Sequence, residues 1–152
     1  MNTIEAVQVQ TKVKMLWTAA VALSIINGAI GVDKTFPQGF KFGAATSAYQ
    51  VEGAWNASDK GESIWDRAMH LHHDKTTDGS NGDVASDSYH HWRRDVEMVH
   101  EMGLHFYRFS ISWPRLLPNA FPTKVSESGK KYYNNLINYL LEKGIEPIIT
   151  LY

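Results

Sequence analysis

The sequence predicts an α/β fold with a parallel sheet, and three observations support this prediction. Three apolar segments typical of strands occur at residues 40–49, 104–113 and 145–152. Two segments with the apolar spacing of amphipathic helices separate these strands. Strands that alternate with helices at this spacing indicate right-handed βαβ units, whose strands lie parallel in one sheet.

The first strand is predicted to be short and to lead into a crowded segment. Residues 43–48 are almost all glycine, alanine or serine, so another chain segment can approach the backbone closely. Residues 61–70 are expected to form one or two helical turns. A loop rich in Asp, Ser, Asn and Gly follows at 70–83.

Two amphipathic helices are predicted between the strands. The first begins near a cap at Ser86 or Asp87 and ends at Gly103, and the second covers 126–143 and ends at Gly144. Residues at three- and four-residue steps define their apolar faces: Tyr89, Trp92, Val96 and Val99 in the first, and Tyr133, Leu136, Ile137, Leu140 and Leu141 in the second.

The second strand carries an arginine between apolar neighbours, in the segment YRFSISWPR. Alternation places Tyr107, Phe109 and Ile111 on one face, which suits packing under helices, and leaves Arg108 on the other face. A buried arginine needs a paired carboxylate, and no acidic residue nearby in the sequence is an obvious partner. We therefore expect a partner from another strand of a closed barrel; a solvated Arg108 on a surface strand is the alternative.

The third strand is the last segment of the sequence, and no helix follows it. A parallel sheet needs both faces covered and its edges protected. The sequence therefore predicts a truncated fold that continues the same alternation elsewhere.

Composition excludes several classes of protein. The chain has 152 residues, a formal net charge of -1 and no cysteine. It lacks the basic character of a nucleic-acid binder and the residues for a disulfide framework or a thiolate metal site. Its seven histidines show no H-E-x-x-H pattern, and no metal is expected.

The first 31 residues have the pattern of a secretory signal peptide. Two lysines precede an uncharged apolar run at 15–31, which ends in small residues suited to cleavage. An uncleaved anchor in the membrane is the alternative, because about 17 apolar residues approach the lower limit for a span. Asn56 begins the glycosylation sequon Asn-Ala-Ser, which agrees with a secreted, extracellular protein. The domain prediction is thus a signal segment at 1–31 and a folded part at 32–152.

Five ordered motifs resemble family 1 glycoside hydrolases, the β-glucosidase family. They are FKFGAATSAYQVEGA at 40–54, GESIWD at 61–66, GDVASDSYHHW at 82–92, YRFSISWPR at 107–115 and GIEPIITLY at 144–152. The resemblance covers the chain from about residue 36 to its last residue and is strongest toward secreted insect members. It implies the N-terminal part, about three βα units, of a (β/α)8 TIM barrel with its site at the carboxyl ends of the strands.

The resemblance also implies roles for individual residues. Gln50 matches the glutamine that hydrogen-bonds sugar hydroxyls, a task that suits an amide because it both donates and accepts. Glu52 is expected to support the loop and not to take part in chemistry. Arg108 matches the arginine beside the catalytic nucleophile, where it would keep that carboxylate ionised.

The activity implied by the resemblance is retaining hydrolysis of a β-glycoside by two carboxyl groups, without a cofactor. The family carries these groups in Asn-Glu-Pro and Glu-Asn-Gly motifs, and neither motif occurs in this sequence. The chain alone is therefore expected to be inactive. A thioglucosidase and a non-catalytic protein that binds a sugar or a partner are the alternatives. Oligomeric state and aglycone specificity cannot be read from the sequence.

Overall fold

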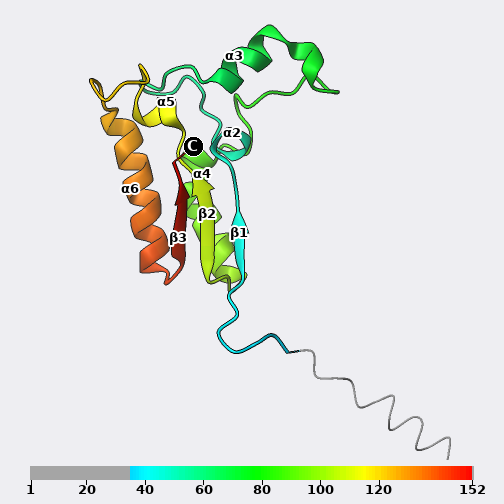
Figure 1. Ribbon diagram of the computed structural model, residues 1–152, viewed down its shortest axis with the longest axis vertical. Coiled ribbons are helices and arrows are strands. Elements are labelled where there is room, and N and C mark those ends of the chain that lie inside the picture. Colours follow the sequence, from blue (N-terminus) through cyan, green and yellow to red (C-terminus); the bar gives the residue numbers. More distant parts are fainter. Residues whose placement is uncertain (1–34, 152) are drawn as a thin grey trace, which may run out of the picture. The chain divides into compact units, whose positions relative to one another are not determined.

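The computed structural model describes residues 35–151 of the chain (Figure 1). It divides into two units, Met1–Phe40 and Lys41–Tyr152. In the first unit, residues 35–40 form a turn in which the Phe40 backbone N–H donates to the Pro37 carbonyl oxygen over 3.0 Å. The predicted signal segment at 1–31 lies outside the described residues.

Three parallel strands form the sheet of the second unit. They are β1 (Gly43–Ala45), β2 (Phe106–Ser110) and β3 (Glu146–Thr150), in the spatial order β1-β2-β3. This arrangement confirms the predicted parallel βαβ sheet. It also gives a reason for the small residues of the first strand, because a Cβ atom at Gly43 would overlap the ring of Phe106 on β2.

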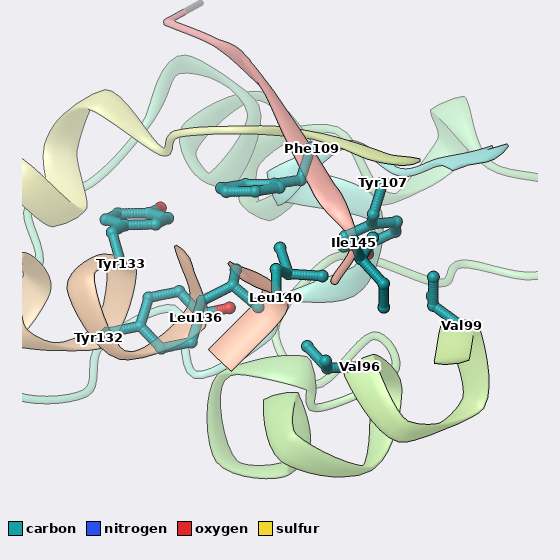
Figure 2. Close-up of a cluster of buried hydrophobic side chains, with 9 residues drawn as sticks. All are labelled: Val96, Val99, Tyr107, Phe109, Tyr132, Tyr133, Leu136, Leu140 and Ile145. Atoms are coloured by element: carbon teal, nitrogen blue, oxygen red, sulfur yellow. The ribbon is translucent and has the colours of Figure 1, made fainter. Parts of the chain in front are cut away.

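Two helices cover one face of this sheet, α4 (Ser88–Glu101) and α6 (Glu127–Glu142). Figure 2 shows their side chains meeting those of β2 in one cluster. The cluster consists of Val96, Val99, Tyr107, Phe109, Tyr132, Tyr133, Leu136, Leu140 and Ile145. The predicted faces of the first helix and of β2 are therefore confirmed. Arg108 points to the opposite face of the sheet, away from the helices.

The helix ends largely follow the predicted signals. Gly103 and Gly144 adopt φ values of +68° and +73° just after the two helices, the left-handed conformation that glycine accepts most easily. Ser126 caps α6 by accepting a hydrogen bond from the Gly129 N–H over 3.0 Å. Asp87 does precede α4, but its side chain makes no capping hydrogen bond.

Two details of the predicted elements are wrong. Leu141 is 57% exposed, whereas Tyr132, which the periodicity did not select, is buried. The second strand ends at Ser110, and Trp113–Leu116 forms a one-turn helix, α5, within segments predicted as strand and loop. Pro114 explains this change, because its fixed φ favours the first turn of a helix and it lacks the N–H that a strand would use.

The long connection between β1 and α4 contains most of the remaining structure. It includes α2 (Ala48–Val51), α3 (Ile64–Leu71) and the 3₁₀ turn η1 (His73–Lys75). The predicted short helix at 61–70 is therefore confirmed, with a shift of its start to Ile64. Within residues 35–151, no helix has the length and apolar character that a bilayer span requires.

Candidate functional site

Two neighbouring clefts lie where β1 and β2 end and their loops begin. The first has a volume of about 380 Å³ and is mainly apolar, and we call it the apolar cleft. Its walls come from α2, the start of α3 and α5, and include Ile64, Trp65, Ile111, Trp113 and Pro114. The carboxyl ends of parallel strands are the usual place for ligands in α/β folds, so this edge of the sheet is the candidate functional site.

The second cleft has a volume of about 580 Å³ and contains Gln50, so we call it the Gln50 cleft. Its other walls come from α3 and from the polar loop that precedes α4; they include Met69, Thr76, Ser80 and Asn81. Tyr49 and Trp65 line both clefts, and their ring centroids lie 6.1 Å apart. The aromatic pair thus forms a wall that the two clefts share.

Gln50 is exposed and sits on the one-turn helix α2 directly after β1. Its backbone N–H donates to the Ser47 carbonyl oxygen over 3.0 Å. Its side-chain amide has no hydrogen-bond partner within residues 35–151, so both its donor and its acceptor can serve a ligand in the cleft. The sugar-binding role of Gln50 stays a prediction, but its position suits that role.

Arg108 is exposed on the sheet face opposite the helices. Its Nε atom donates to the Thr150 hydroxyl oxygen on β3 over 3.1 Å, and no carboxylate among residues 35–151 lies within ion-pair distance. Neither of the two clefts includes Arg108, so the structure does not join it to Gln50 in one site. Its expected pairing with a catalytic carboxylate therefore stays a prediction.

A buried ion pair between Glu52 and Arg115 underlies the site, and the sequence analysis missed half of it. The Arg115 Nε atom donates to Glu52 Oε2 over 2.7 Å, and the two residues are only 2% and 5% exposed. Tyr133 donates its hydroxyl hydrogen to Glu52 Oε1 over 2.6 Å. The supporting role expected for Glu52 agrees with these contacts. The requirement that a buried arginine be paired, which we applied to Arg108, is met instead by Arg115.

Burial raises the pKa of the tyrosine in this group. Burial and the nearby Glu52 carboxylate raise the pKa of Tyr133 well above its usual value. The hydroxyl therefore stays protonated at neutral pH and continues to donate to Glu52, while it accepts a hydrogen bond from the Ser112 N–H over 2.7 Å.

A second buried ion pair fixes the start of α3 beside the apolar cleft. Lys60 Nζ lies 2.7 Å from Asp66 Oδ2, and the two side chains are only 6% and 2% exposed. Asp66 and Ser63 also form a capping box at the N-terminus of α3. Burial by itself would raise the pKa of Asp66, but the hydrogen bonds from Lys60 and Ser63 prevail and lower it.

The structure also shows the surroundings of Asn56 and of the histidines. Asn56 is exposed in the turn after α2, so its side chain is accessible for the predicted glycosylation, which stays a prediction. No group of three or more His, Cys, Asp or Glu side chains within residues 35–151 is close enough together to hold a metal ion. His70 instead forms a pair with Asp83 over 2.8 Å.

The parallel strands, the helices on one face and the clefts at the carboxyl ends are features of part of an α/β barrel. The sequence profile described as Glycosyl hydrolase family 1 matches residues 32–152. The chain therefore belongs to glycoside hydrolase family 1, as its motifs predicted.

The curated relatives include plant and insect proteins. Beta-glucosidase 42 from Arabidopsis thaliana is 56% identical over 117 residues, which cover 77% of this chain and 24% of that protein. Myrosinase 1 from Brevicoryne brassicae is 47% identical over 121 residues, which cover 80% of this chain and 26% of that protein. The chain thus spans about a quarter of the length of these relatives. Because plant and aphid proteins both match strongly, the insect placement stays a prediction.

Solved structures of the family share the fold of this chain. An aphid myrosinase aligns with a TM-score of 0.76 and 48% identity over 77% of this chain and 25% of its own. A family 1 β-glucosidase from Thermotoga maritima aligns with a TM-score of 0.74 and 45% identity over 78% of this chain and 26% of its own. These neighbours are TIM-barrel enzymes, and the partial parallel sheet is consistent with the predicted truncated part of a (β/α)8 barrel.

Proposed function

We propose that this chain supplies part of the sugar-binding site of a β-glucosidase that hydrolyses its substrate with retention of configuration. The observation that carries the proposal is the place of Gln50. Its amide, which has no hydrogen-bond partner among residues 35–151, lines an open cleft at the carboxyl ends of parallel strands, in a chain whose family includes β-glucosidases. An amide in this position can donate to one sugar hydroxyl and accept from another.

The chemical step requires two carboxyl groups about 5–5.5 Å apart, one as acid and base and the other as nucleophile. We propose that other parts of the full-length protein supply both groups. Arg108 lies on the sheet face that a closed barrel would enclose, and there its guanidinium would keep the nucleophile ionised. No cofactor is needed for this mechanism.

Hydrolysis of thioglucosides is a second candidate, supported by the similarity to an aphid myrosinase. A non-catalytic sugar-binding protein is the third. Secretion and glycosylation at Asn56 belong to the proposal as well, supported by the N-terminal sequence pattern and by the exposed turn that carries the sequon.

Assays on the full-length protein and on this chain alone test the proposal. The full-length protein should hydrolyse a chromogenic aryl β-glucoside, and castanospermine, which a Thermotoga maritima β-glucosidase binds, should inhibit it. The chain alone should show no turnover. Hydrolysis by the chain alone would refute our placement of the two carboxyl groups, and a full-length protein that binds the inhibitor without turnover would favour the binding protein. A parallel assay on a thioglucoside separates the two enzymatic candidates.

Two substitutions test the role of Gln50. Gln50→Ala should lower kcat/KM by about tenfold, because hydrogen bonds to the sugar are lost. Asn134→Ala is the matched control, since Asn134 is an exposed amide on α6 that lines neither cleft. Equal values for the two variants would contradict the sugar-binding role.

A further inference from the structure

The segment that carries Gln50 is fixed at both of its ends by other elements of the fold. At its start, the Ala48 N–H donates to the Ser110 hydroxyl oxygen at the end of β2 over 2.8 Å. Just beyond its end, Glu52 accepts hydrogen bonds on both carboxylate oxygens, from Arg115 on α5 and Tyr133 on α6. The four-residue helix α2 has little stability of its own. Its position therefore depends on these contacts.

Arg115 also fixes the backbone that follows Glu52. Its Nη2 atom donates to the Gly53 carbonyl oxygen over 2.8 Å and lies 3.4 Å from that of Ala54. Both residues have positive φ values, +62° and +48°, which is unfavourable for alanine. The guanidinium stacks on Tyr89 of α4, with Cζ 4.2 Å from the ring centroid. Contacts from α4, α5 and α6 thus converge on the residues directly after Gln50.

Stability alone is a weak reason for this arrangement. Removing two charges from water is costly, and apolar residues of similar volume often serve equally well in place of a buried ion pair. Arg115 Nη1 even lacks a hydrogen-bond partner among residues 35–151, which adds to the cost. A fixed geometry is the clearest advantage that a buried, directional pair offers over an apolar contact.

We propose that Glu52, Arg115 and Tyr133 act as a positioning group that holds the amide of Gln50 in the orientation needed for sugar binding. This inference rests on the proposed function, because it assumes that Gln50 contacts the sugar. None of the three residues needs to touch the substrate. They act through the backbone of α2, which Glu52 ties to α5 and α6 only two residues beyond Gln50.

A double-mutant cycle in the full-length protein tests this proposal. Glu52→Gln keeps the size of the side chain but removes the charge that orients Arg115. It should weaken the binding of D-glucose, measured by calorimetry, by about tenfold, since small displacements of positioning groups have large effects. In a Gln50→Ala background the same substitution should change the affinity by less than about twofold, because there is no amide left to position.

Asp66→Asn provides the matched control. The Lys60–Asp66 pair is as deeply buried as the Glu52–Arg115 pair and has the same distance of 2.7 Å, but it holds α3 and not α2. Asp66→Asn should lower the midpoint of thermal unfolding as Glu52→Gln does, yet change the glucose affinity by less than about twofold. If Glu52→Gln prevents folding, Tyr133→Phe replaces it, with an expected loss of about threefold in affinity.

Three results of these binding measurements would overturn the positioning role. An equal loss of affinity from Glu52→Gln in both backgrounds, or from Asp66→Asn, would show a general effect of stability and overturn the positioning role. No loss from Glu52→Gln, when Gln50→Ala does weaken binding, would also overturn it and leave the proposed function intact. No loss from Gln50→Ala itself would refute the sugar contact and the positioning role together.

Discussion

Leu140 and Leu141 are neighbours on α6 with opposite environments, and they offer a direct test of the core. Leu140 is completely buried, whereas Leu141 is 57% exposed. Substituting Leu140 by Ala removes about three buried carbon groups at about 0.8 kcal/mol each and leaves a cavity, for a total loss of about 3 kcal/mol. Leu141→Ala should cost less than about 1 kcal/mol, because most of its side chain already contacts water.

Urea denaturation monitored by circular dichroism measures both values. With a slope of about 2 kcal/mol per molar, Leu140→Ala should lower the midpoint by about 1.5 M and Leu141→Ala by less than about 0.5 M. Both substitutions replace leucine by alanine in the same helix, so the change in helix propensity is the same and cancels. Equal shifts for the two variants would refute the packing of α6 described above.

Three further predictions concern charges and backbone geometry. The folded pKa of Asp66 lies below its unfolded value, so its pair with Lys60 stabilises the protein above about pH 4, and this stabilisation is lost as the pH falls through the folded pKa. When the free energy of unfolding is measured against pH, Asp66→Asn should therefore reduce its decline at acid pH. An unchanged decline would contradict the pairing. The pKa of Tyr133 is raised in the folded state, so the free energy of unfolding should decline as the pH rises above about 10. The absorbance of the Tyr133 tyrosinate should appear only when the protein unfolds. Gly53→Ala should lower the free energy of unfolding by about 3 kcal/mol or more, because its Cβ would overlap a backbone carbonyl oxygen. Gly79→Ala has a similar positive φ but open space around it, and should cost about 1–2 kcal/mol. Similar losses in denaturation experiments would show that the backbone conformation, and not the overlap, determines the cost.

The periodicity of the sequence predicted the face of each main helix but not every residue on it. Leu140 and Leu141 both lie within the apolar stripe of α6, yet only one is buried, since two adjacent positions differ by about 100° around a helix. Tyr132 and Tyr133 are also adjacent, and both are buried. Helix α6 contacts the sheet and α4 at its N-terminal end, which widens the buried face there. Which residues at the margin of a stripe are buried depends on such neighbours, and these lie far away in the sequence.

The same limit explains why the sequence pattern drew attention to Arg108 and gave no sign of the buried pair that Arg115 forms with Glu52. Alternation along a strand shows which face a residue occupies, and it placed Arg108 correctly on the face away from the helices. Arg115 lies on α5, a helical turn that was predicted as a loop, where solvation is the ordinary expectation for arginine. Its partner Glu52 is 63 positions away, a separation that no local pattern can bridge. The family motifs contain both residues, but only the structure brings them together.

Arg115 and Arg108 differ in whether a carboxylate balances their charge. The charge of Arg115 is balanced by Glu52 at 2.7 Å, and both side chains are almost completely buried, so this ion pair forms within residues 35–151. In the part of the chain that the structure describes, the hydrogen-bond partner of the Arg108 side chain is the neutral hydroxyl of Thr150, and Arg108 is exposed. An arginine on the inner face of a barrel would require a carboxylate once water is excluded. On this argument, the proposed sugar contact of Gln50 is supported by residues of this chain, whereas the proposed reaction requires a carboxylate beside Arg108.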